Sequence, residues 1–110
     1  MKRAVAEALE ASIKHWDENA KAQTPKDAST RARDCALCRM FPGVDASRGC
    51  PGCPVHERTG HECEGSPYYD ADSALTHWRF FGDGAHRFRA AAIAERDFLI
   101  SLREPVEDDQ

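Results

Sequence analysis

Four cysteines in two closely spaced pairs are the feature that most constrains how this chain can fold. The pairs Cys35-Ala36-Leu37-Cys38 and Cys50-Pro51-Gly52-Cys53 are separated by eleven residues, so the pattern is C-x2-C-x11-C-x2-C. A tetrahedral metal ion takes four soft ligands, and two C-x-x-C turns supply them in pairs. In the second pair, proline presets the turn and glycine tolerates the positive φ that follows. We therefore predict one structural Zn²⁺ ion bound by Cys35, Cys38, Cys50 and Cys53.

The spacing leaves other metals and ligands open. Zinc sites of this kind usually have a central spacer of roughly 15–20 residues, so the shorter spacer predicts a compact pair of zinc knuckles. Iron in a four-thiolate site or an iron–sulfur cluster is the alternative metal, and ordinary buried or redox thiols are the alternative without a metal. Cys63 competes for the fourth position and could replace Cys50 or Cys53. His56 and His61 are within reach as substitutes, although we expect both rings to face solvent or to cap a turn.

The cysteine count and the N-terminus bear on the cellular compartment. Five cysteines are an odd number, so one chain cannot pair them all in disulfides. Glu7, Glu10 and Lys14 interrupt the apolar run that a signal peptide needs. No stretch approaches the roughly 20 apolar residues of a membrane-spanning helix. We therefore expect a cytoplasmic protein with reduced thiols and no membrane contact.

Residues 1–110 are expected to form a single domain, and residues 1–23 predict its first element, an amphipathic helix. An apolar arc of about 80°, at 100° per residue, runs along this segment. Its members are Val5, Leu9, Ile13, Trp16 and Ala20.

Residues 70–104 predict a helical hairpin. Asp70 is the predicted N-cap of its first helix, which has Leu75, Trp78 and Phe81 on one side. A Gly-Asp-Gly sequence breaks the chain, and the second helix then continues until a proline ends it. The main apolar stripe of this second helix consists of Phe88, Ala91, Ala92, Phe98, Leu99 and Leu102.

Residues 34–67 combine every cysteine with five of the seven glycines and four of the six prolines. This density of turn-forming residues excludes a long regular element. Large aliphatic residues are few, and a chain this short often needs a metal or disulfides to stabilise its core. The predicted fold is therefore mainly α: a small metal-stapled domain of about three helices, with an irregular zinc-knuckle loop region between the first and the second.

Glu95 interrupts the main apolar stripe of the last helix. One interpretation, which we favour, is that its side chain snorkels to solvent or meets a nearby arginine. The other is a buried carboxylate that holds a partner group. The sequence leaves both interpretations open.

The distribution of charge limits the classes of partner. The chain has a net charge of −4, and residues 64–110 carry five arginines against ten acidic side chains. A strong basic face, the usual sign of a phosphate-binding protein, is not evident. Nucleic-acid contact is therefore the alternative that we do not favour. It would use the arginines that gather around the cysteines, Arg31, Arg33, Arg39, Arg48 and Arg58.

Several short segments resemble the small cysteine-rich proteins of phage and prophage genomes. The segments are Asp34-Cys35-Ala36-Leu37-Cys38, Gly52-Cys53-Pro54-Val55, Arg58-Thr59-Gly60 and Cys63-Glu64-Gly65-Ser66-Pro67-Tyr68, together with His15-Trp16-Asp17-Glu18-Asn19. The resemblance implies a small accessory protein that acts on a component of a bacterial host cell. It implies no activity, so no functional residue is transferred from it.

These observations favour a non-enzymatic protein-interaction module. Zinc would fix the loop region against the helices and present a surface to a protein partner. Aromatic side chains are typical interface anchors; the candidates are Tyr68, Tyr69, Trp78, Phe80 and Phe81. We expect Trp78 and Phe81 to pack in the core instead. One form of the hypothesis is an inhibitor of a host defence complex whose acidic C-terminal half mimics nucleic acid.

Catalysis is the hypothesis that the ligand pattern disfavours. A catalytic zinc keeps an open coordination position and a nearby general base, for which Glu57 and Glu62 are the candidates. Cys63 and His61 could form a nucleophile pair. Four cysteine ligands, however, close the coordination shell. We therefore predict no enzymatic activity.

Overall fold

The computed structural model describes residues 1–31, 34–41, 53–59 and 66–107. This part of the chain is helical and contains no strand beyond an isolated backbone bridge between Lys2 and Glu107. Its elements are α1 (Arg3–Ala20), a 3₁₀ helix η1 (Pro25–Asp27), α2 (Ala36–Met40), α3 (Pro54–Thr59), α4 (Tyr68–Phe81) and α5 (Ala85–Ile100). The prediction of a mainly α fold is confirmed.

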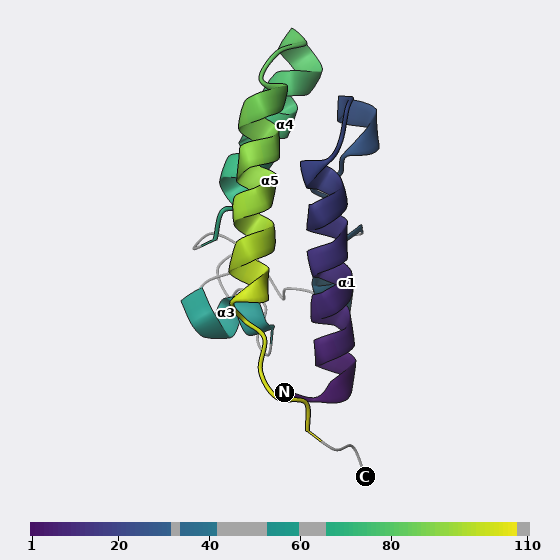
Figure 1. Cartoon of the computed structure of the whole chain (residues 1–110), viewed down its shortest axis with the longest axis vertical. Coiled ribbons are helices and arrows are strands. Elements are labelled where there is room, and N and C mark those ends of the chain that lie inside the picture. Colours follow the sequence, from purple (N-terminus) through teal and green to yellow (C-terminus); the bar gives the residue numbers. More distant parts are fainter. Residues whose placement is uncertain (32–33, 42–52, 60–65, 108–110) are drawn as a thin grey trace.

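The three long helices lie side by side (Figure 1). Helix α5 packs against α1 on one side and against α4 on the other. It runs antiparallel to both neighbours, so α4 and α5 form a hairpin. The helix predicted over residues 1–23 corresponds to α1, and the hairpin predicted over residues 70–104 corresponds to α4 and α5. Within the described residues, none of the helices has the length and apolar content needed to cross a membrane.

Helix α1 buries the side that its sequence predicts. Leu9, Ile13 and Trp16 are 1%, 7% and 3% exposed, because their spacing places them on one face. The buried side also includes a polar residue, Asn19. Its amide donates a hydrogen bond to the Ser29 carbonyl at 2.9 Å and accepts one from the Ser29 N–H at 3.1 Å. Asn19 therefore fixes the segment after η1 against α1.

Two glycines make the turn between α4 and α5. Gly82 ends α4 with a φ of 76°, and its N–H donates to the Trp78 carbonyl at 2.9 Å. Gly84 precedes α5 with a φ of 89°. Residues with a Cβ atom rarely adopt such angles. The turn brings the rings of Trp78 and the fully buried Phe88 to 5.8 Å from each other, so the predicted break and the predicted core role of Trp78 are confirmed.

Two predictions for α4 are wrong. The helix begins at Tyr68, with Pro67 in the N-cap position, and is not capped by Asp70. Asp70 lies instead in the first turn, where a carboxylate suits the helix dipole, and it accepts a hydrogen bond from Arg87 at 2.9 Å. Phe81 is not in the core but 71% exposed, because it is the last residue of α4 and stands beside the turn.

The region expected to be an irregular loop contains two short helices in its described part. Helices α2 and α3 have five and six residues. Leu37 of α2 and Val55 of α3 are 2% and 4% exposed, and they belong to the same hydrophobic core as the long helices. Isolated apolar residues between turns show no periodicity, so the sequence pattern did not reveal this contribution to the core.

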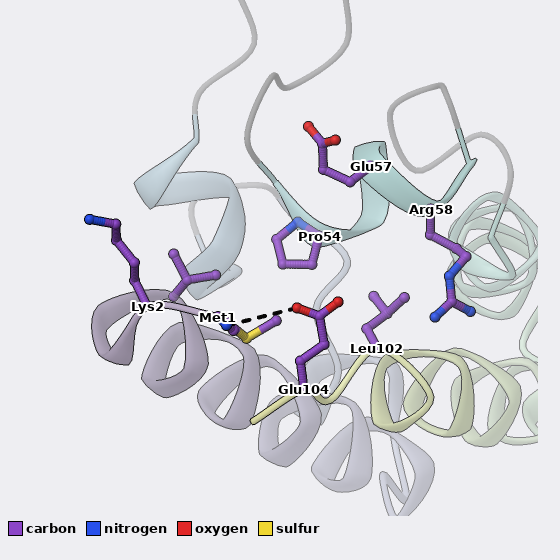
Figure 2. A pocket seen from close by; sticks show the side chains of 8 residues that line it. Met1, Lys2, Pro54, Glu57, Arg58, Leu102 and Glu104 are labelled. Carbon is purple, nitrogen blue, oxygen red and sulfur yellow. Dashed lines mark ion pairs between the residues drawn. The ribbon is translucent and has the colours of Figure 1, made fainter. Parts of the chain in front are cut away.

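The two ends of the described chain lie together (Figure 1). The Glu107 N–H donates a hydrogen bond to the Met1 carbonyl at 2.7 Å. Beside this contact, the start of α1, helix α3 and the residues after α5 surround an open pocket of about 420 Å³ (Figure 2). Arg58 of α3 also donates a hydrogen bond to the Ser101 carbonyl at 3.3 Å. These contacts attach α3 and the C-terminal segment to the same end of the molecule.

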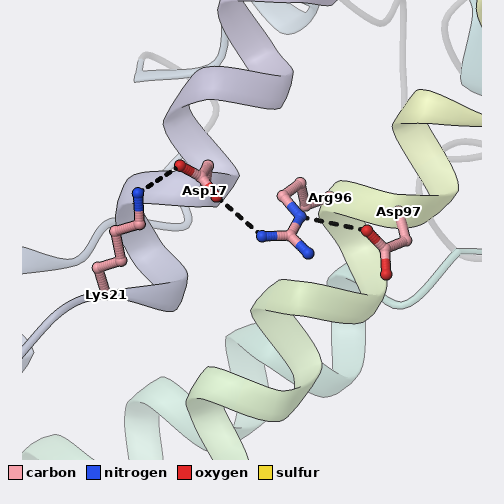
Figure 3. Close-up of polar contacts among 4 residues, drawn as sticks. All are labelled: Asp17, Lys21, Arg96 and Asp97. Atoms are coloured by element: carbon pink, nitrogen blue, oxygen red, sulfur yellow. Dashed lines mark hydrogen bonds and ion pairs between the residues drawn. The ribbon is translucent and has the colours of Figure 1, made fainter.

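An ion-paired cluster joins α1 to α5 at the surface (Figure 3). Arg96 of α5 donates to Asp17 of α1 at 2.8 Å and to Asp97 at 3.1 Å. Lys21 donates to the other carboxylate oxygen of Asp17 at 2.9 Å. The hydrogen bonds from Lys21 and Arg96 hold the pKa of Asp17 below its ordinary value. The cluster therefore fixes how α1 and α5 lie against each other.

Candidate metal centre

Cys35 and Cys38 are positioned by helix α2. Cys35 is the N-cap residue, and its Sγ accepts a hydrogen bond from the Cys38 N–H at 3.4 Å. Ser12 of α1 attaches this helix to the long helices. Its Oγ accepts a hydrogen bond from the Leu37 N–H at 3.3 Å and lies 3.8 Å from Cys35 Sγ. The first C-x-x-C turn is therefore fixed against α1.

Cys53 is positioned by helix α3, which it immediately precedes. Its carbonyl accepts a hydrogen bond from the Glu57 N–H at 2.9 Å, and the residue is 7% exposed. Burial raises the pKa of the Cys53 thiol, and hydrogen bonds from the backbone N–H groups of Val55 and His56 oppose that rise. Backbone donors aimed at a cysteine sulfur also stabilise a metal-bound thiolate.

Cys35, Cys38 and Cys53 line one small cavity. Its volume is about 30 Å³, which is enough for a single ion or water molecule. The apolar side chains on its wall are Trp16, Leu37, Val55 and Leu99. The polar ones are Ser12, His15, Thr30, Arg31, Tyr68 and Glu95. Three of the four predicted ligands, from two separate turns, thus face the same space.

Other predicted ligands lie outside the described residues. Cys50, Cys63 and His61 fall in the segments 42–52 and 60–65, as does Glu62, one of the candidate bases. Within the described residues, no three His, Cys, Asp or Glu side chains are grouped closely enough to hold a metal ion. The three described cysteines therefore surround the cavity without converging on one point.

Two described thiols of the cavity, those of Cys35 and Cys53, favour the protonated form. A side-chain hydrogen bond with Cys38 and burial raise the pKa of Cys35 far above that of an ordinary thiol. Burial likewise raises the pKa of Cys53. The thiolate is both the nucleophile and the metal ligand, so these side chains are poor nucleophiles. Metal binding would release their protons.

Glu95 of α5 places a carboxyl group on the cavity wall. The residue is 2% exposed, and its Oε2 accepts a hydrogen bond from Ser66 Oγ at 3.2 Å. Its Oε1 is buried and has no hydrogen-bond partner in the described part of the chain. Burial raises the pKa of Glu95 to about 7; the Ser66 hydrogen bond opposes the rise and Cys35 adds to it. The favoured interpretation is therefore wrong for solvent, which the side chain does not reach, and no arginine of the described residues pairs with Glu95.

His56 is the substitute ligand that the structure describes. Its ring is half-buried, and Nδ1 is buried without a hydrogen-bond partner among the described residues. The expectation of a solvent-facing ring is therefore met only in part. His56 does not belong to the described wall of the cavity. Glu57, the described candidate base, is exposed and also lies off that wall.

Ser12, Thr30 and Tyr68 form part of the site although no sequence motif marks them. Ser12 stands next to the apolar arc of α1, so a slightly wider arc would have included it. Tyr68 donates a hydrogen bond to the Thr30 carbonyl at 2.5 Å, which joins the start of α4 to the segment before α2. Such long-range pairs leave no local signal in a sequence.

Comparisons with known proteins assign no family to the chain. It matches no family model, and comparisons with curated proteins and with solved structures find no match. The function is therefore inferred from the cavity and the surface of this chain.

Proposed function

We propose that this chain is a small protein-interaction module in which cysteines hold one structural zinc ion. The ligands are Cys35, Cys38 and Cys53 with a further residue, for which the sequence favours Cys50 and offers Cys63 as a competitor. The observation that supports the proposal is the shared cavity, because two separate segments of the chain place three cysteines on the wall of one small space. A zinc ion there would fix the turn-rich region 34–67 against the helices.

A structural role agrees better with this cavity than a catalytic role. A volume of about 30 Å³ leaves no room for a substrate, whereas small-molecule sites usually measure about 300–1,000 Å³. We therefore propose that this cysteine site has no catalytic role.

The proposed partner surface lies at the end of α4. Phe80 and Phe81 are 79% and 71% exposed, at the tip of the α4–α5 hairpin. The ring of His77 lies 4.7 Å from that of Phe81 and supports it from the same helix. Adjacent exposed aromatic side chains on a rigid element are typical anchors of a protein interface. In the phage context that the sequence resemblance implies, the partner would be a host defence complex. The acidic C-terminal half of this chain would occupy the site at which that complex binds nucleic acid.

Metal analysis of cysteine variants tests the structural part of the proposal. We expect the wild-type chain, purified without added metal, to carry one zinc ion in native mass spectrometry. Cys53→Ser should lose it, because a neutral hydroxyl is a poor substitute for a thiolate. Elemental analysis distinguishes zinc from iron, and separate Cys50→Ser and Cys63→Ser variants identify which of the two binds. A Cys53→Ser variant that retains one zinc ion would contradict the assigned site.

A double variant, Phe80→Ser with Phe81→Ser, tests the interaction surface. Because both side chains are exposed, the variant should keep the helical content of the wild type. We expect it to lose the protein that the wild-type chain captures from a bacterial lysate. Val106→Ser is the matched control, since Val106 is a 53% exposed apolar residue that lies beside the start of α1 and not at the end of α4. Equal capture by the double variant and the wild type would show that the surface is misassigned.

A basic groove supports nucleic-acid binding as a second candidate function. The groove has a volume of about 820 Å³ and lies between η1 and the end of α4. Its lining includes three cations, Lys26, Arg31 and Arg79, and one carboxylate, Asp34. Retention on heparin that weakens steeply with salt, and weakens further in Arg79→Gln, would favour this candidate. No retention at low salt would exclude it.

A further inference from the structure

The buried carboxylate of Glu95 has one oxygen atom whose partner is not accounted for. Oε2 accepts the hydrogen bond from Ser66, whereas Oε1 is buried without a partner in the described part of the chain. Burying a polar atom without a hydrogen bond costs about 1–3 kcal/mol, and more if the group is charged. Native proteins therefore leave few such atoms unpaired, and a bound ion or water is the usual explanation for those that remain.

The described wall of the cavity offers no partner for this oxygen. Four other polar side chains on the wall form hydrogen bonds with groups other than Glu95; they are Ser12, His15, Thr30 and Tyr68. Arg31 also lines the cavity, but neither a hydrogen bond nor a charge interaction with Glu95 is present. Among the described residues Oε1 therefore has no partner, and a particle bound in the cavity would supply one.

The composition of the wall indicates what that occupant is. Three thiols and one carboxyl group surround about 30 Å³, a space for one small particle. Thiolates and carboxylates are both zinc ligands, with Zn–S near 2.3 Å and Zn–O near 2.0–2.2 Å. We infer that Oε1 of Glu95 is the fourth ligand of the metal ion bound by Cys35, Cys38 and Cys53. This inference rests on the proposed function and replaces the fourth cysteine in the ligand set.

A carboxylate ligand is consistent with the charges at this site. Three thiolates and one carboxylate carry the same total charge as four thiolates, so the net charge of the occupied site is the same with either ligand set. A divalent cation also removes the penalty of burying Glu95 in its ionised form. In the structure the four groups do not converge at ligand distances, so coordination requires the side chains to turn toward the centre of the cavity.

Ligation by Glu95 changes what the ion holds together. Cys35 and Cys38 belong to α2, and Cys53 precedes α3, so cysteines on their own would join parts of the turn-rich region to each other. Glu95 stands on α5, the central helix of the fold. With Glu95 as a ligand, the ion attaches both short helices directly to the helical hairpin.

X-ray absorption at the zinc edge tests the ligand set, with Glu95→Gln as the variant. Glutamine keeps the shape of the side chain and its capacity to bond to Ser66 or to water, but its neutral amide is a weak zinc ligand. We expect three sulfur atoms and one oxygen around zinc in the wild type. In the variant we expect the oxygen contribution from Glu95 to be lost from the spectrum. We also expect zinc to bind at least about tenfold more weakly than to the wild type.

The outcomes separate this inference from the proposed function. Four sulfur atoms around zinc in the wild-type chain would overturn the role of Glu95 and leave the proposed function standing. Unchanged zinc affinity and an unchanged spectrum in Glu95→Gln would do the same. A wild-type chain without zinc would overturn both. Glu57→Gln is the matched control, because Glu57 is an exposed carboxylate beside Cys53 that lies off the cavity wall, and its zinc affinity should equal that of the wild type.

Discussion

Ser12 Oγ of α1 accepts a hydrogen bond from the backbone N–H of Leu37 in α2, at 3.3 Å. Both residues are almost fully buried, at 1% and 2% exposure. The contact joins the helix that carries Cys35 and Cys38 to the long amphipathic helix. The position of the first cysteine pair therefore depends on a small polar side chain in the interior.

Replacement of Ser12 by alanine should destabilise the protein. Ser12→Ala leaves a buried N–H without a partner, so we expect the free energy of unfolding to fall by about 1–3 kcal/mol in urea denaturation. Ser73→Ala is the control, since Ser73 is exposed on α4 and alanine favours a helix. Equal stability of Ser12→Ala and the wild type would show that this hydrogen bond does not hold α2 in place.

The two aromatic residues Phe81 and Phe88 should differ sharply in their effect on stability. Phe88 is fully buried, and Phe88→Ala should lower the free energy of unfolding by about 3–5 kcal/mol. Phe81→Ala removes an exposed side chain and should change it by less than about 0.5 kcal/mol. Denaturant unfolding of both variants measures the difference. A large loss in Phe81→Ala would mean that Phe81 is covered in solution.

The glycines of the hairpin turn should tolerate alanine to different degrees. Gly82→Ala meets no atom within 4 Å and incurs the backbone penalty of positive φ, about 1–2 kcal/mol. Gly84→Ala incurs the same penalty and also brings Cβ to 3.0 Å from Cδ2 of His77. We therefore expect a larger loss of thermal stability in Gly84→Ala. In a His77→Ala background, the two glycine variants should lose equal thermal stability. A larger loss for Gly84→Ala in that background would show that contact with His77 is not the cause.

The Asp17–Arg96 pair should make a contribution to stability that depends on pH. The pKa of Asp17 is lowered from 3.8 in the folded state, so its contribution is fully present above pH 3.8 and is lost as pH falls through the lowered value. The stability difference between wild type and Asp17→Asn should therefore shrink on acidification. The proposed metal site is the same in both proteins, so the difference between them isolates Asp17. Glu18→Gln, at an exposed position of the same helix, should show no such trend.

The long helices could be predicted because each buries a periodic stripe. The arc of Leu9, Ile13 and Trp16 and the glycine break after α4 are local signals that the structure follows. The predicted Asp70 cap failed because Pro67 starts the helix earlier. The prediction that Phe81 packs in the core was wrong because periodicity does not reveal where a helix ends. Phe81 is the last residue of α4, where no neighbouring element in the described part of the chain covers its side chain.

The candidate site could be predicted less completely than the helices. The C-x-x-C spacing indicates which cysteines act together, and Cys35, Cys38 and Cys53 do line one cavity. The same spacing says nothing of Ser12 or Glu95, because their contacts with the cysteine region arise from tertiary packing. A glutamate within an apolar stripe was the available signal for Glu95, and burial decided between its two interpretations.

Whether one zinc ion stabilises the fold is tested most directly by the zinc content of the purified chain and by its thermal unfolding with and without a chelator. A structural ion binds the folded chain and so contributes its binding free energy to folding. We predict one zinc ion per chain and a marked fall in the melting temperature, with loss of helical signal, when the ion is removed. A purified chain that contains no metal and melts at the same temperature with and without chelator would contradict a structural role for zinc.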